Sequence, residues 1–298
     1  MPHPAQRAAA LAAALLATAP ALAQTRPAAP VRIVAAENFY GDLAARIAGP
    51  DAAVTSILSR ADEDPHLFEA SPAVARDLAS ADIAVANGLD YDPWMAKLLA
   101  ASPRPARRTI VVADLLARHP GDNPHLWYDP AVMPAFARAL AADLSRLDPA
   151  HAAEYDARLA QVLDSLRPLS ERIAALRTRL AGTPVTATEP VFGDMADALG
   201  LRMRNARFQL AVMNDTEPAA SDVAAFEDDL RQHRVRLLIY NSQATDTAAR
   251  RLLDIAHAAG IPVLGVTETE PADTPYPRWM LAQLDALDHA LSTPAPSP

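Results

Sequence analysis

Residues 148–180 carry the feature that most constrains the fold, a helical repeat of apolar side chains that continues for about nine turns. The apolar stripe consists of Leu159, Val162, Leu163, Leu166, Leu169, Ile173, Leu176 and Leu180. Asp148 and Pro149 suit the start of this helix, Gly182 suits its end, and Pro168 predicts a kink within it. A coiled coil would require stricter heptads than these. The sequence therefore predicts one rigid helix, about 45 Å long, that separates two parts of the chain.

On both sides of this helix, short β-type runs alternate with helical segments. Before it, the expected strands are 31–35, 54–58, 82–86 and 109–113, and the expected helices are 39–47, 72–79, 93–101 and 130–147. After it, the expected strands are 185–188, 235–240 and 262–266, and the expected helices are 191–199, 219–232, 246–259 and 278–291. This alternation indicates parallel sheets with helices on both faces.

We therefore predict an α/β fold of two lobes, each a mainly parallel sheet flanked by helices, joined by one long rigid helix. The predicted ranges are 24–147 for the N-terminal α/β lobe, 148–182 for the linking helix, 183–291 for the C-terminal α/β lobe and 292–298 for a disordered tail.

The first 23 residues have the order of a secretory signal peptide. Arg7 is their only charged side chain, an alanine and leucine run follows at 8–17, and Ala21-Leu22-Ala23 supplies small residues for cleavage. The apolar run is too short to span a bilayer, and no similar run recurs, so we expect no membrane insertion. The chain has no cysteine, which excludes a disulfide and a lipid anchor on cysteine. A periplasmic location fits these features best.

Composition and missing motifs exclude several classes of function. The net charge of −9 argues against nucleic acid and anionic membrane surfaces as partners. The sequence lacks H-E-x-x-H, G-x-S-x-G, the Walker P-loop and G-x-G-x-x-G, and only nine glycines are present to build phosphate loops. We therefore predict that the protein is not an enzyme, with a metal-dependent periplasmic enzyme kept as an alternative.

Two near-copies of one phrase, Asp64-Pro65-His66 and Asn123-Pro124-His125, each place a histidine directly after a proline. Proline fixes its own φ and favours extended backbone at the residue before it, so the imidazole is presented from a stiff loop. A single histidine of this kind is more often a capping or core residue. The repetition favours metal binding at His66 and His125.

Carboxylates follow two expected strands of the second lobe. Glu189 comes directly after the strand at 185–188, and Glu268 and Glu270 follow the strand at 262–266. Ligands of open parallel sheets bind beyond the carboxyl ends of the strands, which places these side chains in the cleft between the lobes. Acidic residues at such junctions also favour helix N-termini. Two histidines and two carboxylates would form a four-ligand site suited to Zn²⁺, Mn²⁺ or Fe²⁺.

From about residue 31 to 291 the chain resembles the substrate-binding proteins of bacterial zinc and manganese ABC transporters. The motifs that carry the resemblance are Asn38-Phe39-Tyr40, Asp64-Pro65-His66, Asn87-Gly88 followed by Trp94, Asn123-Pro124-His125-Leu126-Trp127, and Asp148-Pro149. In that family one residue from each of four loops holds the metal. The resemblance implies His66, His125, Glu189 and Glu270 as ligands, with Glu268 as the alternative fourth ligand if the last loop is tighter.

The same resemblance implies capture of zinc or manganese in the interlobe cleft and delivery to an ABC transporter membrane permease by a monomeric periplasmic protein. A periplasmic metal chaperone is the other alternative. Zinc-type members of the family commonly have histidine at the third ligand, where Glu189 stands, and manganese-type members have glutamate. The segment 113–123 lacks the histidine-rich loop of many zinc importers and contains only His119. Asp194 replaces a usual tyrosine, and Asp194 and Asp215 are the next candidates for the third donor.

Overall fold

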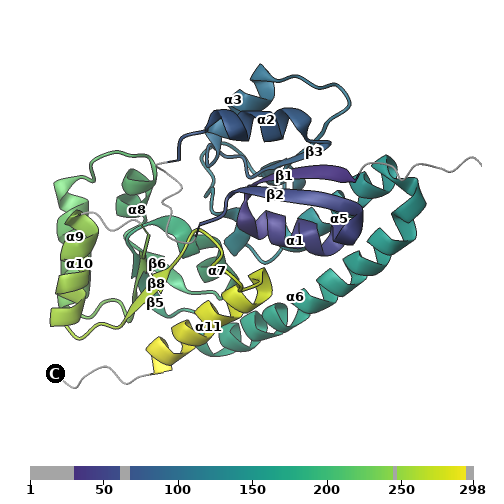
Figure 1. Cartoon of the computed structure of the whole chain (residues 1–298). Helices are drawn as coiled ribbons and strands as arrows, with labels where there is room; N and C mark the ends of the chain where they lie inside the picture. The colour runs from purple at the N-terminus through teal and green to yellow at the C-terminus, as the bar shows by residue number, and fades with distance from the viewer. Residues whose placement is uncertain (1–29, 61–67, 244–246, 293–298) are drawn as a thin grey trace, which may run out of the picture.

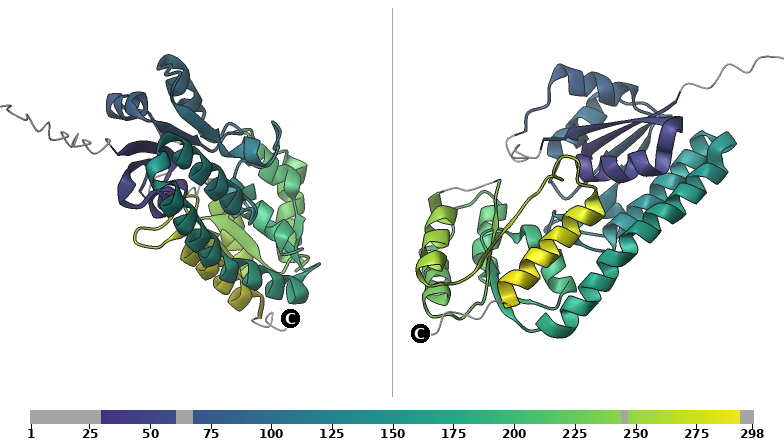
Figure 2. Two further views of the ribbon diagram at one scale, coloured as in Figure 1. Left: turned by 90° about the vertical axis from the view of Figure 1, so that its right-hand side faces the viewer. Right: turned by 60° about the horizontal axis from the view of Figure 1, so that its bottom comes forward.

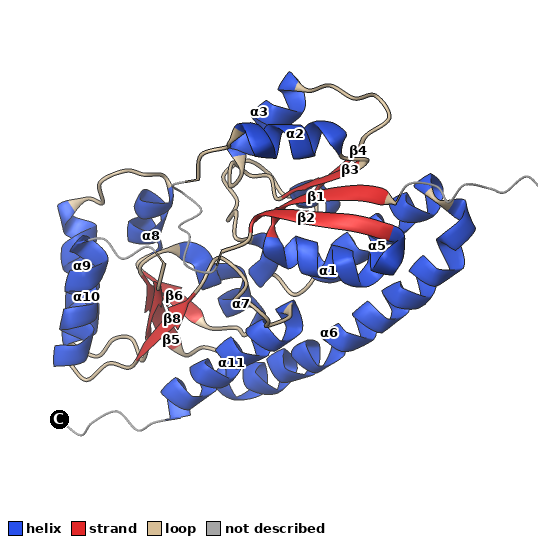
Figure 3. Ribbon diagram, in the orientation of Figure 1, coloured by secondary structure: helices blue, strands red, loops and turns tan. Residues whose placement is uncertain are grey.

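Four parallel strands form the first sheet of the computed structural model, which describes residues 30–60, 68–243 and 247–292. The strands are β1 Val31–Glu37, β2 Ala52–Leu58, β3 Ile83–Ala86 and β4 Arg108–Val111. They lie in the order β2-β1-β3-β4, with Ile33 of β1 opposite Val54 of β2 (Figures 1 and 3). The central strands are buried on both faces, as expected for a parallel sheet.

Helices cover both faces of this sheet (Figure 3). They are α1 Asn38–Ala48, α2 Pro72–Ser80, α3 Pro93–Ala101, α4 Val112–Leu115 and α5 Val132–Leu147. The helices α1 and α5 pack on one face, and α2 and α3 pack on the other against Val34 and Ala84. Proline at the first position of α2 and α3 presets the helical φ, and the Ser71 hydroxyl accepts from the Val74 amide at the start of α2.

The second sheet repeats this plan with β5 Pro184–Ala187, β6 Arg202–Arg204, β7 Leu238–Asn241 and β8 Val263–Val266 in the order β6-β5-β7-β8. Its helices are α7 Gly193–Ala198, α8 Ala206–Met213, α9 Ala220–Arg231, α10 Thr247–Ala258 and α11 Tyr276–Ser292. The strand β6 and the helix α8 are additions to the elements expected from the sequence, and so is α4, whose residues 112 and 113 were expected to end the strand 109–113. Ser292, expected in the tail, is the last residue of α11.

The long helix α6, Ala152–Leu180, follows one 3-10 turn, Pro149–His151, and runs beside both lobes (Figure 1). Pro168 lies within it and does not end it. The buried stripe contains Tyr155, Val162, Leu166, Leu169, Ile173, Leu176 and Leu180. Gly182 has a φ of +81°, the left-handed conformation that glycine favours after a helix. The prediction of one long helix between the two sets of alternating strands and helices is confirmed.

One apolar core extends through both lobes along this helix. It includes Val31 of β1, Leu140 of α5, Val266 of β8 and Leu284 of α11, all buried. The helix α11 packs beside α6 (Figure 2), and both helices contribute buried side chains to this core. In the ranges that the structure describes, no helix has the length and apolarity needed to cross a membrane.

Candidate metal site

His125 is held in one orientation by its own loop. The Asn123 side-chain carbonyl accepts hydrogen bonds from the His125 backbone amide at 3.2 Å and from Nδ1 at 2.7 Å. The Asn123 amide nitrogen donates to the Pro190 carbonyl at 2.8 Å. The oxygen of the Asn123 side chain, and not its nitrogen, therefore faces the imidazole of His125. Nδ1 therefore carries the proton, and Nε2 is the nitrogen with the lone pair. The residue is only 2% exposed, and Nε2 has no hydrogen-bond partner among the described residues.

Glu268 reaches this histidine from the opposite lobe. Its Oε2 lies 3.4 Å from His125 Nε2, and its side chain is fully buried. The Tyr91 hydroxyl donates to Oε2 at 3.0 Å, and the Asn241 amide donates to Oε1 at 2.5 Å. A buried imidazole and a buried carboxylate therefore face each other at the carboxyl ends of strands from both sheets, as the strand order predicts for a ligand site.

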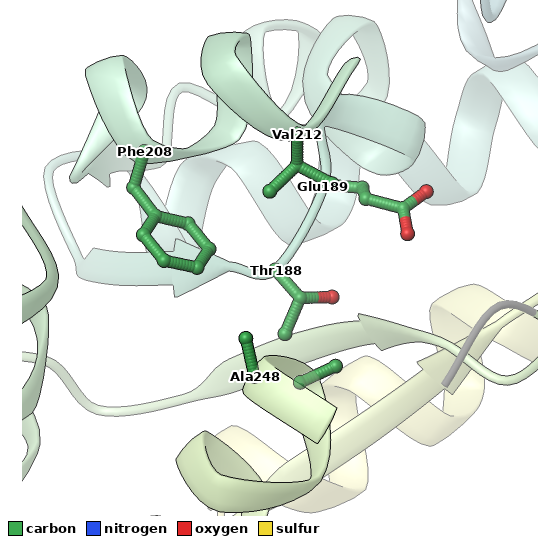
Figure 4. A pocket seen from close by; sticks show the side chains of 6 residues that line it. Thr188, Glu189, Phe208, Val212 and Ala248 are labelled. Atoms are coloured by element: carbon green, nitrogen blue, oxygen red, sulfur yellow. The ribbon is translucent and has the colours of Figure 1, made fainter. Parts of the chain in front are cut away.

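Glu189 joins this group through Asn241. It lies two residues after the end of β5, with Thr188 in between. Its Oε2 accepts a hydrogen bond from Asn241 Nδ2 at 3.2 Å. Figure 4 shows the Glu189 carboxylate pointing away from Phe208 and Thr188. These residues line a cavity of about 10 Å³ together with Val212, Ala248 and Ala249. That volume has room for about one water molecule, so the cavity is too small for a larger ligand.

Glu270 is turned towards α1. Its backbone forms two hydrogen bonds with the Asn38 side chain, which donates to the Glu270 carbonyl at 2.7 Å and accepts from its amide at 3.0 Å. Burial raises the pKa of the Glu270 carboxyl to about 9, the negative charge of Asp42 adds to the rise, and Arg46 opposes it. The charged groups that act on Glu270 thus belong to α1, whereas Glu268 faces His125.

The remaining candidates occupy other positions. His66 lies outside the described residues. Asp194 on α7 lies 3.4 Å from Arg118, and burial raises its pKa to about 6 against the opposing charge of that arginine. Asp215 is exposed, with a φ of +50°. Within the described ranges, no three His, Cys, Asp or Glu side chains are grouped closely enough to hold a metal by themselves.

Asn241 and Tyr91 also contribute to the site, although no sequence motif identifies them. Each follows or lies near the carboxyl end of a strand, β7 or β3, which is the same positional signal that identified the glutamates. Asn123 belongs to the Asn-Pro-His phrase, which does not reveal its contact with Pro190. Their amide and hydroxyl groups orient the candidate ligands, and this role depends on contacts between segments far apart in the sequence.

The family described as "ZnuA: Zinc-uptake complex component A periplasmic" matches residues 33–290. The chain belongs to this family. The resemblance drawn from the Pro-His phrases and their neighbours is therefore confirmed, and it extends over both lobes and the long helix.

Several relatives of this ZnuA-family chain have names that state a metal. The high-affinity zinc uptake system protein ZnuA of Paracoccus denitrificans is 25% identical over 242 residues, covering 67% of this chain and 73% of that protein. The manganese ABC transporter substrate-binding lipoprotein PsaA of Streptococcus mitis is 20% identical over 248 residues, covering 78% of each.

Among solved structures, the periplasmic zinc binding protein TroA from Treponema pallidum matches with a TM-score of 0.75 at 19% identity. The match covers 89% of this chain and 100% of that one. This likeness confirms the predicted fold, two parallel α/β lobes and one long helix.

Proposed function

We propose that this protein captures a divalent transition metal, zinc or manganese, in the periplasm and delivers it to the membrane permease of an ABC transporter. The observation that carries the proposal is the buried pair of His125 and Glu268, which lie 3.4 Å apart and come from opposite lobes. Family membership supports the same function. The predicted signal peptide, which lies outside the described residues, accounts for the location.

The proposed ligands are His66, His125, Glu189 and Glu268. We favour Glu268 over Glu270 as the fourth ligand because its carboxylate faces the imidazole of His125, whereas the charged groups acting on Glu270 lie on α1. The Asn38 side chain hydrogen-bonds the backbone of Glu270 and so fixes the position of the loop that carries both glutamates. Two nitrogen and two oxygen donors match the chemistry of Zn²⁺ and also accommodate Mn²⁺.

Binding and release require no bond chemistry from the protein. The imidazole must be neutral to donate its Nε2 lone pair, and the Asn123 carbonyl holds the tautomer that presents it. A divalent ion would offset the repulsion between the carboxylates of Glu189 and Glu268, of which Glu268 is fully buried and has little access to water. We infer that the protein acts as a monomeric carrier rather than as an enzyme, and that the metal is its cargo.

Calorimetric titration of the purified, metal-stripped chain with Zn²⁺ and Mn²⁺ tests the proposal. His125→Ala and Glu268→Ala should each weaken Zn²⁺ binding by at least about tenfold, since loss of a supporting group alone typically costs 10- to 100-fold. Glu270→Ala is the matched control from the same loop and should bind metal like the wild type. Wild-type protein that binds neither ion would overturn the function, and a loss confined to Glu270→Ala would reassign the fourth ligand.

A further inference from the structure

Asn241 lies between the two candidate carboxylates. It is the last residue of β7, is 1% exposed, and its Nδ2 is 2.5 Å from Glu268 Oε1 and 3.2 Å from Glu189 Oε2. Its Oδ1 accepts from the Gln243 backbone amide at 3.0 Å, which fixes the orientation of the amide. The two N–H groups of one side chain are therefore directed at oxygens of two different glutamates.

The turn that follows β7 also holds the loop of Glu268. The Gln243 side-chain carbonyl accepts from the backbone amides of Glu268 and Thr269, and its amide nitrogen donates to the Thr269 hydroxyl at 2.6 Å. Both Asn241 and Gln243 therefore hold the loop that carries Glu268. Asn241 cannot rotate away from Glu268 without breaking hydrogen bonds that are buried and costly to lose.

The two oxygens of Glu268 have different surroundings. Oε1 receives the Asn241 amide, and Oε2 lies towards His125 Nε2 and receives the Tyr91 hydroxyl. Both oxygens accept a hydrogen bond, but the one to Oε1 is shorter, 2.5 Å against 3.0 Å for Oε2, and leaves Oε1 with less electron density to give to a metal. A metal beside His125 is therefore expected to take Oε2, and chelation by both oxygens of Glu268 is disfavoured.

We propose that Asn241 is a specificity-determining residue, which makes Glu189 and Glu268 each bind the metal through one oxygen and so favours zinc over manganese. This inference rests on the proposed function. Zn²⁺ is satisfied by four donors in a tetrahedron, whereas Mn²⁺ suits sites richer in oxygen ligands with octahedral geometry. Restricting two carboxylates to one oxygen each removes donors that Mn²⁺ would use and Zn²⁺ does not need.

Competition between Zn²⁺ and Mn²⁺ in Asn241 variants tests this role. Asn241→Ala removes both donors, and Asn241→Leu removes them while roughly preserving the side-chain volume. In both variants the ratio of the Mn²⁺ to the Zn²⁺ dissociation constant should fall by about tenfold, within the range for groups that support metal ligands. The matched control is Gln209→Ala, which removes a buried amide of the same lobe that donates to the Arg204 carbonyl and should leave the ratio unchanged.

A ratio that stays constant or rises in the Asn241 variants would overturn the role of Asn241, while metal binding by the wild type would still support the proposed function. If the wild type binds neither ion, both fail. X-ray absorption of the wild-type protein loaded with Zn²⁺ provides a measurement that does not depend on folding of a variant. It should show four nitrogen and oxygen donors at about 2.0–2.2 Å. Five or six donors would contradict the four-coordinate geometry on which the proposed selectivity for zinc depends.

Discussion

At the residue scale, Glu37 is a buried acid that the proposed site does not use. It ends β1, is fully buried, and neither carboxylate oxygen has a hydrogen-bond partner among the described residues. Burial raises its pKa well above the ordinary value, and the negative charge of Asp92 adds to the rise. Folding therefore favours the protonated form of this side chain, and the folded state loses stability when the unfolded chain can ionise.

We expect Glu37→Gln to raise the melting temperature at pH 7–8 by several degrees. Below the ordinary pKa of 4.5 both states of the wild type are protonated, so the gain should vanish there and grow as the pH rises. Thermal unfolding in the presence of a chelator measures this. Glu227→Gln is a control of opposite sign, because hydrogen bonds and charges from Arg251 and Arg231 lower the pKa of Glu227. A Glu37→Gln gain that does not depend on pH would contradict a buried neutral carboxyl.

The second prediction at the residue scale concerns the metal preference of a Glu189→His variant. Exchanging it for histidine replaces an oxygen donor by a nitrogen donor, which suits Zn²⁺ better than Mn²⁺. We expect Zn²⁺ to bind the wild type more tightly than Mn²⁺, as the general affinity order requires, and Glu189→His to shift competition further towards zinc. If the ratio of the two affinities does not change, the third donor must be sought among other residues, beginning with Asp194.

From the sequence, Glu189, Glu268 and Glu270 are candidate ligands because each follows a strand, and the carboxyl ends of parallel strands meet at one edge. His66 and His125 are candidates because of the repeated Pro-His phrase. The sequence could not decide between Glu268 and Glu270. Their positions depend on how the loop after β8 is held by the Asn38 side chain, a contact between residues 232 positions apart. The role of Asn241 could not be predicted from the sequence either. A lone asparagine at a strand end has many structural uses, and its two glutamate partners are distant in the sequence.

At the element scale, the first residue of α7, Gly193, packs closely against the loop that carries His125. A Cβ added to Gly193 would lie 2.9 Å from the Asn123 amide nitrogen, which donates to the Pro190 carbonyl. The other end of the same amide accepts from the His125 ring. Asn123 thus links the loop of one candidate ligand to the loop that follows Glu189.

Gly193→Ala should displace Asn123 and weaken Zn²⁺ binding by about tenfold, the scale of losses in groups that orient metal ligands. Alanine is a better helix former than glycine by about 0.5–1 kcal/mol, so global stability should not fall in parallel. Titration and thermal unfolding of the same preparation separate the two effects. Wild-type affinity in Gly193→Ala would show that the Asn123 contact does not position His125.

Most helices and strands could be predicted because their apolar periodicity is strong, as in α6 and β1. The unexpected elements, among them β6 and α8, have weak sequence signals. The strand β6 has only the sequence Arg202-Met203-Arg204, whose charged ends do not indicate a strand, and it forms because β5 offers a free edge for pairing. The helix α8 spans eight residues and begins after Asn205 in a left-handed conformation, so it depends on tertiary packing of Phe208.

At the scale of the whole molecule, direct contacts connect the two lobes in addition to α6. The Tyr128 hydroxyl donates to the Thr267 carbonyl at 2.8 Å, and the Tyr276 hydroxyl donates to the Trp127 carbonyl at 2.6 Å. The helix α11 contacts both α6 and α1. The lobe boundaries at 147 and 183 remain predictions, and this shared core argues that neither lobe moves far alone.

We therefore expect metal binding to proceed with small loop or rocking motions and without wide closure about a hinge. Small-angle X-ray scattering should give the same radius of gyration for metal-free and Zn²⁺-loaded protein, while Zn²⁺ raises the melting temperature because it binds only the folded chain. Asn38→Ala is an informative variant, since it removes two hydrogen bonds from the Glu270 loop and leaves the apolar core intact. It should weaken metal binding without changing the radius of gyration. A clear contraction of the wild type on binding Zn²⁺ would contradict this, because the shared core would then have to separate and close again around the metal.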